Sequence, residues 1–360
     1  MARAAIDSGV ATRDLDLDAY AAGLRGQVHR SSLVMRPVFE AARSAGRRIV
    51  FAEGEEPRVL RAVQAMREEG MARPILVGRP EVVAARIERE GLSLQPGEAF
   101  DLVNPESDER YRDYWGSYHA IMSRRGVSPD LAKAILRTNS TAIAAVMVHR
   151  GEADSLICGT VGAYSWHLKY VSEVLARDHL QPVGAMSLIL LDRGPLFVAD
   201  THVHLEPDAA QIAQTMIASA RHARRFGLAP KVALCSGSQF GSLDSRAARA
   251  ARDAIALLDA QGADFEYEGE MHTDAALDPD LRERLLPGNR LRGRANILVY
   301  AGAEPAGAAR NLLKSVAEGI EVGPVLMGMG NRAHIVTPGV TVRGLLNISA
   351  LAATPVESYG

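Results

Sequence analysis

The chain has 360 residues, of which 47% are hydrophobic, and a formal net charge of −2. That length is enough for two domains with substantial cores, and the near-neutral charge gives no sign of nucleic acid or a membrane surface as a partner. No apolar run approaches the roughly 20 residues of a membrane-spanning helix, and the first residues lack the apolar segment of a signal peptide. Cys158 and Cys235 lie in apolar runs, so we expect two buried, reduced thiols and a cytoplasmic protein.

Strand-like and helix-like segments alternate along the first half of the chain. Runs rich in β-branched and aromatic residues predict strands, and apolar residues spaced three and four apart predict helices. In chain order the pattern predicts a helix over 15–30, a strand over 48–54, a helix from Pro57, a strand over 74–78, a helix over 80–90, a helical region over 130–150 that breaks near Asn139, a strand from Asp154 and a helix from Tyr164.

The second half continues this alternation and adds a hairpin. Arg193-Gly194-Pro195 separates two apolar runs, which predicts an antiparallel pair of strands over 185–192 and 196–201. The pattern then predicts helices over 208–226, 247–258, 306–316 and 342–353, and strands over 231–236, 295–302, 325–327 and 334–336.

Two other groups of residues leave alternatives open. Four rings, Tyr111, Tyr114, Trp115 and Tyr118, favour helix packing between subunits or domains, with stacking on an adenine ring as the alternative. His202-Val-His204 would place two imidazoles on one strand face. Zinc needs a third ligand of fixed geometry, and the sequence offers none that is obvious, so no metal site is predicted.

We interpret four acidic residues as structural groups: Glu53, Glu55, Glu270 and Asp274.

Three turns with glycine and hydroxyl residues follow predicted strands. They are Gly159-Thr160, Ser236-Gly237-Ser238 and Thr337-Pro338-Gly339, and each precedes a predicted helix. Backbone N–H groups at such a turn, together with a helix N-terminus, attract anions such as phosphate. The turns are therefore the candidate ligand sites.

The segment Gly323–Asn347 resembles the C-terminal signature of the phosphate acetyl/butyryltransferase family, whose members make acyl phosphates from acyl-CoA. The segments FAEGEEPRVLRA and GE…DAA are also similar to that family. In active members the last turn reads Ser-Arg-Gly and an Asp follows; the matching positions here are Thr337, Pro338 and Gly344. Glycine supplies no base, and proline supplies neither charge nor N–H. The resemblance therefore implies a site that keeps CoA binding without catalytic residues.

The same resemblance implies the fold. It covers residues 31–355 and implies an α/β protein with two α/β subdomains and a cleft between them, a phosphate acetyltransferase-like form of the isocitrate dehydrogenase-like superfamily architecture. Subdomain 1 would comprise 31–181 plus 331–360, and subdomain 2 would comprise 182–330. Family members pair through the second subdomain, so we expect a homo-oligomer that is at least a dimer.

The first 30 residues carry a second resemblance. DSGVATR, followed by a predicted helix and HRSSLVMRPVF, is similar to the junction in large hybrid NADP-dependent malic enzymes. This implies that residues 1–30 join an N-terminal malic enzyme core to the rest. NADP and a divalent metal would then bind only in that core.

The resulting hypothesis is a regulatory domain that binds acetyl-CoA as an effector and controls the oxidative decarboxylation of malate to pyruvate. A working phosphate acetyl- or butyryltransferase and a purely architectural oligomerisation module are the alternatives. The expected acetyl-CoA contacts are Ser236, Ser238, Asn331, Thr337 and Gly339, with Arg310, Lys314 and Arg332 for the CoA phosphates. Gly159, Thr160 and Lys169 form an expected anion or acyl pocket, where Lys169 matches an arginine that handles phosphate in active members.

Overall fold

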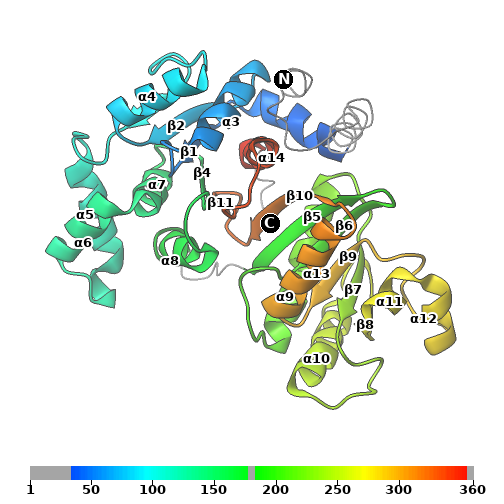
Figure 1. Ribbon diagram of the computed structural model, residues 1–360. Helices are drawn as coiled ribbons and strands as arrows, with labels where there is room; N and C mark the ends of the chain where they lie inside the picture. The colour runs from blue at the N-terminus through cyan, green and yellow to red at the C-terminus, as the bar shows by residue number, and fades with distance from the viewer. Residues whose placement is uncertain (1–33, 177–182, 355–360) are drawn as a thin grey trace, which may run out of the picture.

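The strands of this protein form two separate sheets, which lie side by side in the computed structural model (Figure 1). The structure describes residues 34–176 and 183–354, so the helix expected over 15–30 lies outside the described residues. The first sheet has five strands in the order β11-β4-β1-β2-β3. The second has six, in the order β10-β5-β6-β9-β7-β8. The predicted α/β fold is confirmed.

The first sheet is parallel throughout and is covered by helices on both faces. Alternate strand residues such as Phe51 and Val50 belong to different hydrophobic clusters, as the two-residue period of a buried strand requires. One face packs on a helix over 34–45, α3 (Pro57–Glu68), α4 (Pro80–Glu90) and α14 (Val342–Ala353); the other packs on α5 (Tyr111–Met122), α6 (Pro129–Thr138), α7 (Ser140–His149) and α8 (Tyr164–Leu175). Its strands are β1 (Arg48–Phe51), β2 (Arg73–Val77), β3 (Asp101–Val103), β4 (Ser155–Cys158) and β11 (Ala333–Ile335).

The second sheet is mixed. β10, β5 and β6 pair antiparallel, which confirms the predicted hairpin, whereas β6, β9, β7 and β8 run parallel. α9 (Ala209–Arg225) and α10 (Arg246–Gln261) pack on one face, and α13 (Ala303–Ser315) with α11 (Thr273–Leu277) packs on the other, followed by α12 (Pro279–Leu285). The strands are β5 (Gly184–Leu191), β6 (Gly194–Ala199), β7 (Lys231–Cys235), β8 (Glu266–Met271), β9 (Ile297–Tyr300) and β10 (Ile320–Met327).

Side-chain caps explain several helix starts. The Asn139 side chain accepts from the amide of Ala142 and begins α7 where the sequence predicts a break. Asp208 and Gln211 form a reciprocal capping box at the start of α9. Thr341 accepts from the amide of Gly344 and begins α14. These local signals place the helix ends close to their predicted positions.

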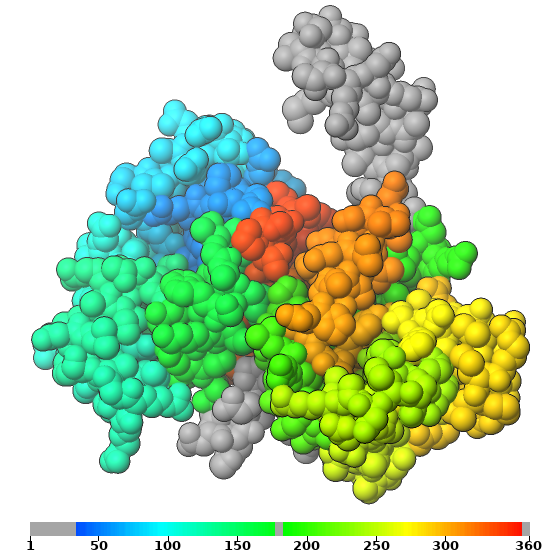
Figure 2. Space-filling view, turned by 60° about the horizontal axis from the view of Figure 1, so that its bottom comes forward, coloured from blue at the N-terminus to red at the C-terminus, as the bar shows by residue number. Residues whose placement is uncertain are grey.

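α14 lies between the two sheets (Figure 1), and ten of its twelve residues are buried. It contacts α3 and β4 on the first side and β10 on the second. One hydrophobic cluster therefore runs continuously from Phe51 of β1, through Ile348 of α14, to Met186 of β5. Figure 2 shows the red C-terminal segment reaching the surface between the parts of the molecule that hold the two sheets.

Sheet membership changes twice along the chain, between β4 and β5 and between β10 and β11. Strands β1 to β4 and β11 form the first sheet, and β5 to β10 form the second. We call the first sheet with its helices the first half and the second sheet with its helices the second half. The division into independent subdomains stays a proposal.

The aromatic residues of α5 pack within the first half. Tyr114 and Tyr118 are buried, and their hydroxyls donate to Glu152 and Glu173.

Among the described residues, no single helix is long and apolar enough to cross a membrane; α6 and α7 together meet that test but bend by 108° at their junction.

Candidate ligand site at the strand ends

The carboxyl ends of β1, β4 and β11 are neighbours at one edge of the first sheet. Glu53 follows β1, the Gly159-Thr160 turn follows β4, and the Thr337–Gly339 turn follows β11. A Cβ at Gly159 would lie 2.2 Å from the carbonyl oxygen of Val336, so the last two turns are in direct contact. Ligands of open α/β sheets bind outside this edge. The fold therefore brings together two of the three predicted turns.

The Glu53 carboxylate lies beneath these turns. Its oxygens accept from the Gly159 amide at 3.1 Å and from the Thr160 hydroxyl at 3.2 Å. Burial raises the pKa of Glu53 to about 7, although these hydrogen bonds act in the opposite direction. Glu53 is thus a structural group, as interpreted from the sequence, and it also carries an ionisable proton near neutral pH.

His167 adds a second ionisable group beside Glu53. Its Nε2 lies 2.7 Å from the Val161 carbonyl oxygen, which can only accept, so Nε2 carries the hydrogen. Nδ1 of the neutral ring then accepts from the Thr141 hydroxyl at 2.8 Å. Burial lowers the pKa of His167, which favours that neutral ring. The His167 side chain is buried under the turn.

Arg58 fastens the two turns to each other. Its guanidinium donates to the carbonyl oxygens of Pro338 at 2.6 Å, Val340 at 3.0 Å and Thr160 at 3.1 Å. Its remaining Nε–H donates to Glu56 at 2.6 Å. This arginine therefore holds the backbone of the site.

Residues of the second half approach this edge through an aromatic contact. The Tyr164 ring, at the start of α8, lies 4.5 Å from the His202 ring with an interplanar angle of 33°. Burial, with the nearby Arg310 charge, lowers the pKa of His202 to about 4, so the ring is neutral at pH 7. The two halves thus meet beside the turns.

The expectation that His202 and His204 share a strand face is wrong. β6 ends at Ala199, and the chain then turns. The Asp200 carboxylate accepts hydrogen bonds from the backbone amides of His202, Val203 and His204 in this turn. His204 Nδ1 lies 2.7 Å from the same carboxylate. Among the residues the structure describes, no group of three His, Cys, Asp or Glu side chains is arranged to hold a metal.

The predicted anion pocket is brought together only in part. Gly159 and Thr160 lie in one turn, but their amide and hydroxyl donors are used by Glu53. Lys169 is 61% exposed on α8, where it lies 4.0 Å from Glu173 and over the Tyr170 ring. We therefore correct its assignment: Lys169 is a surface residue of the helix, not a partner of the turn.

The serine-rich turn after β7 has a structural role at Ser238. The buried Ser238 hydroxyl donates to Glu270 at 2.7 Å and accepts from the Leu243 amide at 3.1 Å. Glu270 also accepts from the Gly241 amide and Arg252, which confirms that this glutamate is structural. The expected acetyl-CoA contact at Ser238 is therefore replaced by an internal bond, whereas Ser236 is partly exposed.

Arg310 and Lys314 were expected to meet CoA phosphates, and the structure pairs them with a carboxylate instead. Both cations donate to Glu321 of β10, with 2.6 Å from Lys314 and a bidentate contact from Arg310. Arg310 and Glu321 are each only 9% exposed. A buried arginine already held by two oxygens is not available to a phosphate, so this assignment is corrected.

Asn331 is also an internal group. Its Nδ2 donates to the carbonyl oxygens of Leu351 at 2.8 Å and Thr354 at 2.9 Å, and its Oδ1 accepts from His334 at 2.9 Å. Its predicted ligand contact is therefore corrected to a clamp on the end of α14. Of the predicted acetyl-CoA contacts, Ser236, Lys314, Arg332, Thr337 and Gly339 keep partial or full exposure, and Lys314 among them is paired with Glu321.

The positions that would carry catalytic groups in the family signature also have defined surroundings. Gly344 lies in the first turn of α14, where a Cβ would approach Val340 Cγ2 to 3.0 Å and Thr341 Oγ1 to 3.4 Å. Pro338 contributes only its carbonyl, which accepts from Arg58. Neither position offers a base or a cation to a ligand.

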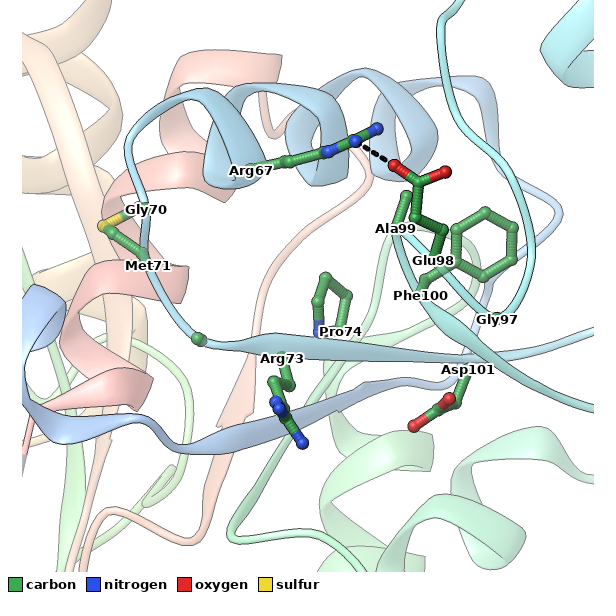
Figure 3. A pocket seen from close by; sticks show the side chains of 11 residues that line it. Arg67, Gly70, Met71, Arg73, Pro74, Gly97, Glu98, Ala99, Phe100 and Asp101 are labelled. Atoms are coloured by element: carbon green, nitrogen blue, oxygen red, sulfur yellow. Dashed lines mark hydrogen bonds and ion pairs between the residues drawn. The ribbon is translucent and has the colours of Figure 1, made fainter.

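A cavity of about 440 Å³ lies at the opposite, amino-terminal edge of the first sheet. Arg67 of α3 donates to Glu98 across it (Figure 3), and the first residues of β2 and β3 line its floor. None of the predicted ligand residues is among its lining. This cavity is separate from the strand-end site.

The chain matches the phosphate acetyl/butaryl transferase family over residues 33–353 and belongs to that family. It is 46% identical to an NAD-dependent malic enzyme of Rhizobium meliloti over 361 aligned residues, which cover 99% of this chain and 47% of the relative. An NADP-dependent malic enzyme of Escherichia coli is 45% identical, with 99% and 48% covered. The chain thus spans about half the length of these relatives.

The fold is shared with solved phosphotransacetylases. The phosphotransacetylase from Streptococcus pyogenes superposes with a TM-score of 0.81 at 20% identity, covering 89% of this chain and 97% of that one. Together with the family match, this confirms that the C-terminal signature and its implied architecture were recognised correctly from the sequence.

The contacts that three residues make in the site were not predicted from the sequence. Arg58 and Tyr164 have no distinguishing motif, and Glu53 lies 106 residues from the turn that it contacts. The available signal was the position of Glu53 just past a predicted strand, since a parallel sheet gathers such positions at one edge.

Proposed function

We propose that this chain is an acetyl-CoA-binding regulatory part of a malic enzyme and that it lacks phosphotransacetylase turnover. The observation that carries the proposal is the last turn of the site. It keeps backbone donors and a helix N-terminus next to Thr337 and Gly339, while Pro338 and Gly344 supply neither cation nor base. Binding a CoA thioester requires donors and contact area, whereas acyl transfer also requires a base and oxyanion stabilisation.

The assembly context rests on the malic enzyme relatives. Their length is about twice that of this chain, so an N-terminal malic enzyme core with NAD or NADP and a divalent metal would be the regulated partner. Acetyl-CoA would control malate decarboxylation by binding two states of the assembly with different affinity. The proposed contacts are Ser236, Thr337 and Gly339, and the proposed location is the cytoplasm. Arg332 is left out because it precedes β11 and lies at the opposite, amino-terminal edge of the first sheet.

Pairing through the second half is supported by the outer face of α13. Leu312 of α13 is 63% exposed, and Val316, the C-cap residue directly after the helix, is 77% exposed. Exposed apolar residues that share one face favour contact with a second copy. The proposed assembly is accordingly at least a homodimer.

A working acyltransferase is the second candidate, and one observation favours it. The pKa of Glu53, about 7, is matched to proton transfer near neutral pH. Against this, both carboxylate oxygens already accept hydrogen bonds from the turn that they support. The two candidates differ in whether phosphate releases CoA.

Two measurements on the purified chain separate the candidates. Calorimetry with acetyl-CoA should show saturable binding, and a thiol assay with acetyl-CoA and phosphate should show no release of CoA. Phosphate-dependent release that is lost in Glu53→Gln would establish the transferase instead. Absence of acetyl-CoA binding would leave an architectural role.

A further inference from the structure

Both ends of α14 are held by side chains, and the two ends serve different parts of the molecule. At its start, Thr341 caps the amide of Gly344 at 3.0 Å. The Val340 amide donates to Thr337 at 2.9 Å, and Arg58 holds the Val340 carbonyl. The proposed ligand turn is therefore continuous with the first turn of the helix.

The far end of α14 carries carbonyl groups that receive donors from three separate segments. Arg47, next to β1, donates to the Thr354 carbonyl at 2.9 Å, and Asn331 donates to the Leu351 and Thr354 carbonyls. Arg225 donates to the Leu351 carbonyl at 3.4 Å and to the Thr354 hydroxyl. A cation at a helix C-terminus is stabilised by the helix dipole.

Arg225 differs from the other two donors because it belongs to the second half. It is the last residue of α9, and its Nη1 donates to Nδ1 of His222 at 3.2 Å, one turn earlier. Burial, with the Arg225 charge, lowers the pKa of His222 to about 3, so the ring is neutral and can accept. His222 thus fixes the guanidinium that reaches α14.

We propose that Arg225 is a positioning residue for the Thr337–Gly339 turn and acts on it through α14. The helix has twelve residues, so it spans about 18 Å from the turn to Arg225. Ten of those residues are buried against both halves, so the helix moves as a unit rather than bending locally. The position of α9 in the second half then determines the position of the Thr337–Gly339 turn in the first half.

This inference rests on the proposed function only in naming a CoA thioester as the ligand of the turn. It deepens that function, because it gives the second half a route by which its position changes the ligand affinity. The contacts themselves are independent of the ligand, and they can be tested without it.

The test uses amide hydrogen exchange of the full chain without ligand, with Val340 and Gly344 as reporters. Arg225→Gln should speed exchange at both reporters by about tenfold, as loss of a part-buried cation at a helix C-terminus predicts. Arg225→Lys should restore much of the protection, because the charge is retained. Arg224→Gln is the matched control, since Arg224 is a neighbouring arginine, 43% exposed, that pairs with Asp264.

A merely structural role for Arg225 predicts a different result. Exchange would then rise only near residues 222–226 and 350–354, or equally in the Arg224→Gln control, and either outcome overturns the proposal. If Arg225→Gln does not fold, Thr354→Val removes the hydroxyl that Arg225 contacts and keeps the side-chain size. Unchanged exchange at Val340 and Gly344 in that variant would also overturn it.

Calorimetry separates this inference from the proposed function. Acetyl-CoA should bind Arg225→Gln about tenfold more weakly than the wild-type chain and bind Arg224→Gln normally. Equal affinity of wild type and Arg225→Gln refutes the positioning role and leaves acetyl-CoA binding intact. If Arg225→Gln speeds exchange at the reporters but the wild-type chain binds no acetyl-CoA, the positioning role is supported and the proposed function is refuted.

Discussion

The ring of Tyr164 lies 4.5 Å from the ring of His202, and this contact joins α8 of the first half to the turn after β6 in the second. The Tyr164 hydroxyl is buried and has no hydrogen-bond partner among the described residues. The contact between the tilted rings therefore joins the two halves, and the buried hydroxyl adds a desolvation cost.

Replacing Tyr164 tests that division of roles. Tyr164→Ala should lower the free energy of unfolding by about 3 kcal/mol, because a buried ring between the halves is lost. Tyr164→Phe should change it by less than about 1 kcal/mol, since only an unpartnered hydroxyl is removed. Urea unfolding of both variants measures the difference. Similar losses in the two variants would show that the hydroxyl holds the contact.

The proton on Glu53 makes stability depend on pH. Its pKa in the folded chain, about 7, lies above the ordinary value of 4.5, so the folded state binds the proton more tightly than the unfolded state. The stabilisation is present below pH 4.5 and is lost as the pH rises through 7, with a total of about 3 kcal/mol.

Glu53→Gln mimics the protonated side chain and isolates this effect from other titrating groups. The free energy of unfolding of the variant minus that of the wild type should increase between pH 5 and pH 8. Chemical denaturation at both pH values gives the comparison. A constant difference would mean that Glu53 titrates in the folded chain as it does in the unfolded one.

Gly159 is required by both its backbone conformation and its neighbours. Its φ of +101° is unfavourable for residues with a side chain, and an added Cβ would lie 2.2 Å from the Val336 carbonyl oxygen. Gly159→Ala should therefore destabilise the chain by at least about 3 kcal/mol. Gly339→Ala is the matched control in the adjoining turn, because no atom lies within 4 Å of its Cβ position. Thermal unfolding that ranks the two variants equally would contradict the close approach.

Disrupting the Arg310–Glu321 ion pair should change the stability of the fold rather than the affinity for a ligand. Burial alone would raise the pKa of Glu321, but hydrogen bonds from Arg310 and Lys314 bring it below its ordinary value. Glu321→Gln leaves the buried Arg310 charge uncompensated and should lower the free energy of unfolding by about 3 kcal/mol.

Lys314→Ala is the corresponding control for that pair. The lysine is 32% exposed, so its removal should cost less than about 1 kcal/mol and leave acetyl-CoA affinity unchanged. Urea unfolding and calorimetry check the two statements. A weaker acetyl-CoA affinity in this variant would restore Lys314 to the ligand site.

Local sequence signals were sufficient for most of the elements. Pro80 and Gly91 bound α4 at its two ends, and a proline start with a left-handed glycine end is a strong helix signature. The apolar run over 342–353 likewise predicted α14 with its observed bounds. These predictions depend on neighbouring residues, which the sequence displays directly.

Pairings between distant residues could not be predicted in the same way. Nothing local indicates that Glu321 would hold Arg310, or that Asn331 would reach Leu351, because each bond depends on the tertiary packing of α13, β10 and α14. The placement of Lys169 depends on tertiary packing in the same way. Its alignment with an arginine of the family does not determine whether the side chain points toward the turn or into solvent, and in the structure it is exposed beside Glu173.

The position of β11 in the chain has a consequence for biosynthesis. It completes the first sheet by pairing with β4, yet residues 159–332, which include the whole second half, separate the two strands. While the ribosome is still making the second half, the outer edge of β4 has no β11 to pair with, and an open strand edge invites association with other nascent chains. We therefore expect the backbone amides of β4 to become protected from hydrogen exchange later than those of β2 while the chain is being translated.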